Sequence, residues 1–130
     1  LMRQAKNDAY RSGMVDIKTD ASQLNFKDVD KALDSLKNSA SYKGMITNKE
    51  GYKLYENLTD LVDKWKNLPA DQYHTPEGFD SLKQAIGDAI ESIPMDQRKA
   101  RTMGNNVYNS VKQTINTQAP TYADVMKSYP

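Results

Sequence analysis

The chain of 130 residues contains no cysteine and only one histidine, His74. The lack of cysteine excludes disulfide bonds and thiol nucleophiles. Together with the single histidine, it also excludes an ordinary zinc site, which takes three or four Cys or His ligands. An excess of charge of one sign is lacking too, because 18 Lys and Arg stand against 17 Asp and Glu. The net charge of +1 argues against a protein built mainly to neutralise nucleic-acid phosphates, since such binding grows with the number of cationic contacts.

Long hydrophobic runs are also missing. No apolar stretch approaches the ~20 residues that a membrane-spanning helix needs, and no signal-peptide pattern opens the chain. We therefore expect no membrane-spanning segment, and one helical domain over residues 1–130 that is long enough to bury a core. The chain begins at Leu1 rather than Met, and its last residues stop inside a helical pattern. We interpret it as a piece excised from a longer protein, and the alternative is an engineered or processed terminus.

Apolar residues recur in four segments at the three- and four-residue spacing of amphipathic helices. The clearest segment, 48–68, begins at Asn48, which is suited to cap the first turn, and Pro69 ends it. Leu58 and Trp65 lie on its apolar face. We expect Trp65 to anchor the core, and the alternative is that this face docks onto the rest of a larger protein.

The remaining segments complete a helical bundle. Thr75 and Pro76 are suited to begin a helix, as N-cap and first helical residue. Gly104 lies within another helical segment, where a glycine costs ~1 kcal/mol relative to alanine, so we expect the backbone of a neighbouring helix to approach it closely. The predicted fold is all-α, a bundle of about five to six helices with no significant sheet. The predicted helices cover 1–12 with Gly13 as its cap, about 27–42, 48–68, 75–93, about 96–117 and a last stretch from Pro120, with loops at 14–25 and 43–47.

The strongest catalytic signal is the pair Glu91 and Ser92 near the end of a predicted helix. A Glu–Ser pair on a helix also occurs in lytic transglycosylases, where a carboxylic acid protonates a glycosidic oxygen. Those enzymes need further segments of the Gly-Leu-Met-Gln and Ala-Tyr-Asn types, and 102–106 and 107–109 match neither. We therefore predict no enzyme and no catalytic residue, with Glu91 on a solvated face.

Cofactor and metal motifs are equally weak. Asp28, Asp30 and Asp34 are spaced like the start of a calcium loop, but the glycine that such a loop needs at its sixth position is Leu33 here. No glycine-rich phosphate loop is present. His74 has no nucleophile at an identifiable spacing, so we interpret it as a packing or hydrogen-bonding residue at a helix start. The sequence predicts no cofactor and no metal.

A polar face on the 96–117 helix is more informative. It includes three asparagines, which are poor residues inside helices because their side chains compete for backbone hydrogen bonds. We interpret it as an interaction face for another helix or another copy of the chain, and the alternative is an ordinary solvated face. A basic cluster starts beside it but lacks interleaved aromatic residues, so we expect no specific nucleic acid. The face comprises Arg98, Thr102, Asn105, Asn109, Lys112 and Asn116, and the cluster comprises Arg98, Lys99 and Arg101.

The stretches 73–83, 111–115 and 118–127, with 9–16 before them, are spread along most of the length of the chain. They resemble segments of large virion proteins of tailed bacteriophages and prophages, of the tail tape-measure or internal ejection type. The resemblance includes no catalytic motif and brings no active-site residues. It implies a non-enzymatic structural or assembly module of a virion protein, which acts through helix-mediated protein–protein contacts.

The resemblance also implies partners and a place. The partners would be other virion proteins or further domains of the same chain, with self-association as a further arrangement, and the place would be the virion or the bacterial host cytoplasm during assembly. Two alternatives stay open. One is a non-catalytic fragment of a phage cell-wall-degrading protein of the lytic transglycosylase type, and the other is a stand-alone bacterial protein-interaction module.

Overall fold

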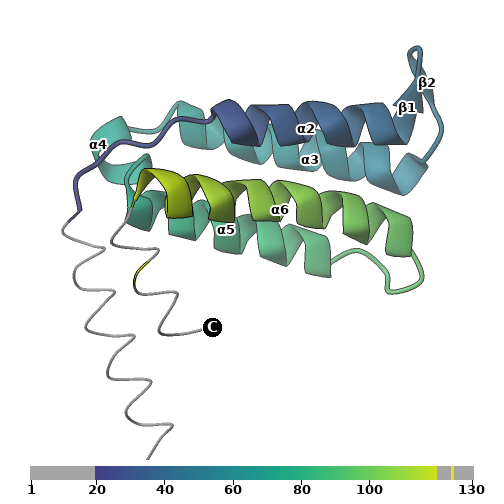
Figure 1. Cartoon of the computed structure of the whole chain (residues 1–130). Coiled ribbons are helices and arrows are strands. Elements are labelled where there is room, and N and C mark those ends of the chain that lie inside the picture. The colour runs from purple at the N-terminus through teal and green to yellow at the C-terminus, as the bar shows by residue number, and fades with distance from the viewer. Residues whose placement is uncertain (1–19, 120–123, 125–130) are drawn as a thin grey trace, which may run out of the picture.

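The computed structural model describes residues 20–119 and residue 124. Within them, four long helices lie side by side and a short helix lies at one end (Figure 1). The prediction of an all-α bundle is therefore confirmed. The elements are α2 (Lys27–Ala40), β1 (Ser41–Tyr42), β2 (Met45–Ile46), α3 (Lys49–Lys66), α4 (Ala70–Tyr73), α5 (Pro76–Glu91) and α6 (Arg98–Gln118).

Predictions near both ends of the chain fall outside this part. The helix predicted over 1–12 and its cap Gly13 lie outside the described residues. Of the stretch predicted to be helical from Pro120, only Asp124 is described, and it is helical. In the described part, no helix combines the length and the hydrophobicity that crossing a bilayer requires.

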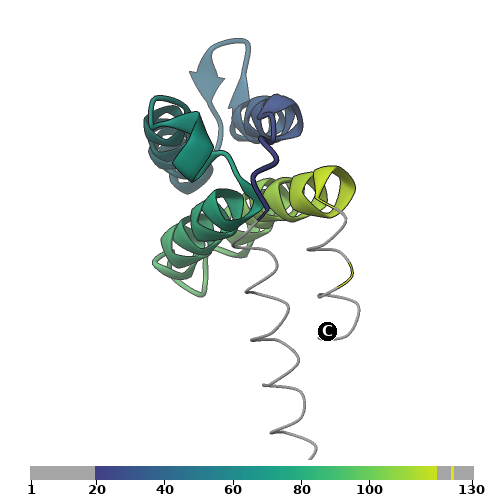
Figure 2. The same ribbon diagram turned by 90° about the vertical axis from the view of Figure 1, so that its left-hand side faces the viewer.

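The four long helices alternate in direction along the bundle (Figure 1). Helix α6 packs against α2, α3 and α5, and Figure 2 shows α2 and α3 nearly end-on, with α5 and α6 running obliquely beneath them. Because α6 contacts every other long helix, the apolar residues of α6 are buried in the core between the helices. The polar side of α6 is left as an outer surface of the bundle.

Two predicted helix caps are present. The Asn48 side chain accepts a hydrogen bond from the Gly51 backbone N–H at 2.8 Å. The Thr75 hydroxyl accepts one from the Gly78 backbone N–H at 3.2 Å, and Pro76 is the first residue of α5. Each cap satisfies a backbone donor that has no partner inside its helix, which fixes where α3 and α5 begin.

Gly104 lies in the core, but the predicted close approach of a neighbouring helix backbone is wrong. A Cβ atom at this position would lie 2.7 Å from Leu54 Cδ2 and 2.8 Å from Ile90 Cγ1. The close approach is made by side chains of α3 and α5 rather than by their backbones. Around it, the largest fully buried side chains are Phe79, Leu58, Leu82, Ile86, Ile115, Val29, Val62, Val107, Val111 and Thr114.

The connection between α2 and α3 differs from the prediction. Helix α2 ends at Ala40 instead of continuing to Tyr42, and the predicted loop 43–47 forms part of a two-stranded antiparallel hairpin. Lys43 and Gly44 form its turn with φ angles of 47° and 84°. Two successive residues of positive φ make the tight turn whose twist matches paired strands. The helical prediction at Tyr42 was wrong because strands of two residues are too short to show a period.

The segment before α2 is irregular, as predicted, but part of it is buried. Leu24 and Phe26 both belong to the core, and the Leu24 backbone N–H donates to the His74 carbonyl at 2.7 Å. This contact ties the segment to the start of α5, some fifty residues later in the chain. The short helix α4, between α3 and α5, was not predicted either.

Candidate functional site

The polar face predicted on the last long helix lies on the outer side of α6. Five of its six residues are exposed, and Asn116 is half-buried. Within the described residues, the side chains of Asn105 and Asn109 make no hydrogen bond. The Asn116 Oδ1 atom is shielded from solvent and also lacks a partner there. The structure thus leaves the amide groups unused by the bundle, while contact with a partner stays a prediction.

An open hollow of about 450 Å³ lies beside this face, between α5 and α6. On one wall, the Tyr108 ring packs beside Gly87, where a Cβ atom would lie 3.4 Å from ring atom Cε2. The hollow therefore has an aromatic side and a rim of both charges, which suits a polar peptide segment better than an apolar ligand. Its lining residues are Gln84, Gly87, Asp88, Ile90, Glu91, Arg101, Asn105 and Tyr108.

The hollow brings together residues that carry three different sequence signals. Asn105 belongs to the predicted interaction face, Arg101 to the basic cluster and Glu91 to the catalytic alternative. Arg98 and Lys99 of the cluster are exposed, whereas Arg101 is half-buried and its guanidinium donates to the Met95 sulfur. Arg101 is thus the only member of the cluster that lines the hollow.

Glu91 and Ser92 occupy the surroundings expected for a helix end. Both side chains are exposed, and the Ser92 hydroxyl donates to the Ala89 carbonyl at 2.7 Å. A general acid of a glycosidase lies in an apolar enclosure that holds its proton, whereas Glu91 lies on the rim of an open hollow. This environment favours the interpretation of Glu91 as a solvated side chain.

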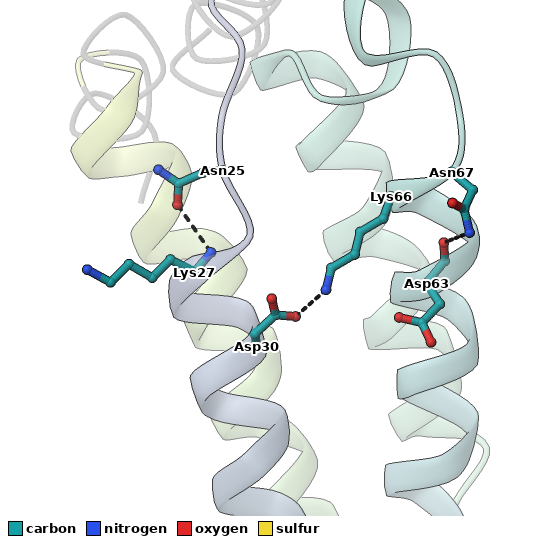
Figure 3. Close-up of polar contacts among 6 residues, drawn as sticks. All are labelled: Asn25, Lys27, Asp30, Asp63, Lys66 and Asn67. Carbon is teal, nitrogen blue, oxygen red and sulfur yellow. Dashed lines mark hydrogen bonds and ion pairs between the residues drawn. The ribbon is translucent and has the colours of Figure 1, made fainter.

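The aspartates of α2 are separate surface groups. Asp28 and Asp34 are exposed, and Asp30 pairs with the Lys66 ammonium of α3 at 2.6 Å (Figure 3). Between residues 20 and 119, no three His, Asp or Glu side chains come together as a group that could hold a metal ion. Asp30 therefore links α2 to α3 at a partly exposed position, where an ion pair adds about 0–1 kcal/mol.

The end of the bundle next to α4 is built around Trp65 and His74. Trp65 is half-buried, and its indole N–H donates to the Gly78 carbonyl at 3.1 Å. The Tyr73 ring lies perpendicular to the indole at 5.8 Å. The His74 Nε2–H donates to the Trp65 carbonyl at 2.9 Å, and the imidazole meets the Phe26 ring edge-on at 4.9 Å. The prediction that His74 packs and hydrogen-bonds at a helix start is confirmed.

The exposed apolar hairpin at the other end of the bundle was not predicted from the sequence. Tyr42, Met45 and Ile46 are all exposed. The sequence signal for this hairpin is the pair Lys43–Gly44, which lies between two short runs that contain large side chains. A pair that ends in glycine fits a two-residue hairpin turn.

Comparisons with protein-family models, with curated proteins and with solved structures find no match to this chain. The resemblance to virion proteins therefore remains a prediction. The candidate site is defined by its geometry, which consists of the polar face of α6 and the hollow that α6 shares with α5.

Proposed function

We propose that this chain is a non-enzymatic structural or assembly module of a phage or prophage virion protein, which acts through helix-mediated contacts with other proteins. The polar face of α6 carries the proposal. Asn105 and Asn109 lie exposed in the middle of a helix and make no hydrogen bond within the described residues. Asparagine lowers helix stability at such positions, and hydrogen bonds to a partner would offset that loss.

The neighbouring hollow supports the same interpretation. Asp88 and Glu91 from α5 and Arg101 from α6 line it, so a segment that crosses it meets charges of both signs. A partner helix that packs along α6 would place polar side chains against Asn105 and Asn109. Side chains at the border of the same partner helix would lie against the hollow between α5 and α6. The partner is another virion protein, a further domain of the parent chain or a second copy. The contact forms in the virion or in the host cytoplasm during assembly.

Site-specific photo-crosslinking tests the proposed face. A photoreactive residue is placed at Asn109 in bacteria that assemble the parent particles, and the matched control carries it at Asn57, an exposed asparagine in the middle of α3. We expect crosslinks to virion proteins, or to another part of the parent chain, at Asn109 and not at Asn57. Equal labelling at both positions, or no crosslink at Asn109, would contradict the proposal.

The parent reading frame tests the virion assignment separately. A long frame that lies among genes for phage structural proteins supports it. A short frame that begins near Leu1 and lies among bacterial genes would contradict it, even if the α6 face binds a protein. The crosslinking result and the genetic result can therefore fail independently.

A further inference from the structure

The hairpin formed by β1 and β2 concentrates exposed apolar surface. Four large apolar side chains are exposed among the described residues, and three of them belong to this hairpin. The exposed fractions are 64% for Tyr42, 72% for Met45 and 52% for Ile46. Single exposed apolar residues are common on protein surfaces, whereas clusters mark contact sites. Figure 1 shows the hairpin standing clear of the four long helices.

The hairpin is apolar on both of its faces. Directly opposed residues of paired antiparallel strands share a face, and successive residues alternate between faces. Tyr42 pairs with Met45, whereas Ile46 pairs with Ser41, so Ile46 lies on the face opposite to the other two apolar side chains. An antiparallel sheet that packs on one side commonly keeps its other face polar, and this hairpin does not. A hairpin that is apolar on both faces fits an apolar medium that surrounds it, such as a lipid layer, better than a single protein surface.

The chain around the hairpin is basic. Residues 37–53 contain four lysines and one carboxylate, Glu50, although the whole chain has a net charge of only +1. None of these lysines takes part in an ion pair within the described residues. Lys43 lies at the turn, with its ammonium 5.4 Å from the centroid of the Tyr42 ring. The four lysines are Lys37, Lys43, Lys49 and Lys53.

We propose that this hairpin is a lipid-docking tip, which enters the headgroup region of an anionic bilayer with Tyr42, Met45 and Ile46 while the neighbouring lysines meet lipid phosphates. Aromatic residues favour the depth of the headgroups, and basic residues beside an anionic leaflet strengthen attachment. Lys43 at the turn limits the depth, because a charged group is unfavourable in the hydrocarbon core. The tip therefore touches the bilayer without spanning it. This surface is separate from the α6 face and does not rest on the proposed function.

Vesicle flotation of the full 130-residue chain tests the proposal. We expect the chain to float with vesicles of phosphatidylcholine mixed with phosphatidylglycerol, to float weakly with phosphatidylcholine alone, and to bind less as salt is added, because exposed charges are screened. No binding of the unmodified chain to the anionic vesicles would overturn the proposal.

Substitutions at the tip identify which residues act. The double variant Met45→Ser and Ile46→Ser should lower the vesicle partition coefficient about tenfold, because it removes most of the insertable apolar surface. Lys43→Glu should lower it at least about fivefold on anionic vesicles, since each basic residue near the surface contributes about that factor. Circular dichroism should show unchanged helix content in both variants, because the hairpin lies outside the core.

Two matched control variants test whether vesicle binding depends on the hairpin or on any exposed apolar or basic side chain. Met95→Ser removes a methionine that is 78% exposed on the α5–α6 connection, and Lys64→Glu reverses an exposed charge in the last turn of α3. Both should bind vesicles nearly as the unmodified chain does. Losses equal to those of the hairpin variants would overturn the proposal. Retention on immobilised polyglutamate without vesicle binding would also overturn it and would indicate an acidic protein partner.

Discussion

The two ends of the bundle use their large side chains in opposite ways. Next to α4, Trp65 and His74 are held by hydrogen bonds to backbone carbonyls, and the Phe26 ring packs against His74. At the hairpin end, Tyr42 and Met45 face solvent. The first group comes from the end of α3, the connection before α5 and the segment before α2, and the second comes from the hairpin between α2 and α3. Both groups include aromatic residues, so residue type alone does not separate them. What separates them is the number of distant segments that meet at each end.

Because of this difference, we expect one end of the bundle to stabilise the fold and the other to bind a partner. The end next to α4 joins the segment before α2, the end of α3 and the start of α5, so a change there disturbs three parts of the chain at once. The hairpin joins only α2 and α3 and leaves its side chains outside the core. Substitutions should therefore change the free energy of unfolding at the first end and partner binding at the second.

Phe79→Ala should have the largest effect. Phe79 is fully buried in the first turns of α5 and contacts the Phe26 ring at 4.8 Å. Removal of a buried phenylalanine side chain lowers stability by about 3–5 kcal/mol, which is a large part of the 5–15 kcal/mol typical of a domain. Urea unfolding followed by circular dichroism measures the loss. Tyr42→Ala at the hairpin end is the matched control, and an equal loss there would remove the distinction between the ends.

Trp65→Ala should lower stability by about 2 kcal/mol, less than Phe79→Ala, because the indole is half-buried and loses less transfer free energy. Its fluorescence gives an independent readout, since Trp65 is the only tryptophan. We expect emission that iodide quenches partially. Full quenching, with an unchanged melting temperature for Trp65→Ala, would support a docking surface at this position instead of an anchor.

Gly104→Ala should lower stability by about 1 kcal/mol. The new Cβ atom meets the Leu54 and Ile90 side chains, and overpacking of a core costs about 1–3 kcal/mol. The better helix propensity of alanine offsets about 1 kcal/mol of this. Thermal unfolding measures the balance, with Gly104→Ser as a more crowded comparison. If Gly104→Ala raised the melting temperature, the Leu54 and Ile90 side chains would not crowd the new Cβ atom, and the predicted overpacking would be wrong.

Glu91→Gln should have the smallest effect. Glu91 is exposed at the end of α5, so its charge contributes little to the free energy of unfolding. We expect an unchanged melting temperature and no peptidoglycan hydrolysis by either the unmodified chain or the variant. Hydrolysis by the unmodified chain that Glu91→Gln abolishes would instead restore the cell-wall enzyme alternative.

Local signals explain which parts of the fold could be predicted. Asn48 and Thr75 are recognisable caps because capping depends on residues only three positions apart. The burial of Leu24 could not be predicted, because it depends on a hydrogen bond to His74. The hairpin was missed because two-residue strands carry no period, although the Lys43–Gly44 pair was a usable turn signal.

The candidate site could be predicted only in part, for the same reason. The exposure of Asn105 and Asn109 follows from the helical period of α6, which places them opposite its apolar residues. The hollow beside them depends on how closely α5 and α6 approach at Gly87 and Tyr108. The distance between α5 and α6 is set by tertiary packing, and it cannot be inferred from the periodicity of either helix alone.

Native-state hydrogen exchange is the most direct test of the contrast between the two ends, because it reads both in one experiment. Amides in well-packed elements open only with large parts of the fold, whereas exposed elements exchange early. We expect strong protection in 58–66 and 78–90 and rapid exchange in 41–46. The Leu24 amide, which donates to the His74 carbonyl, should also be protected. Protection of the hairpin equal to that of α3 and α5 would contradict the account.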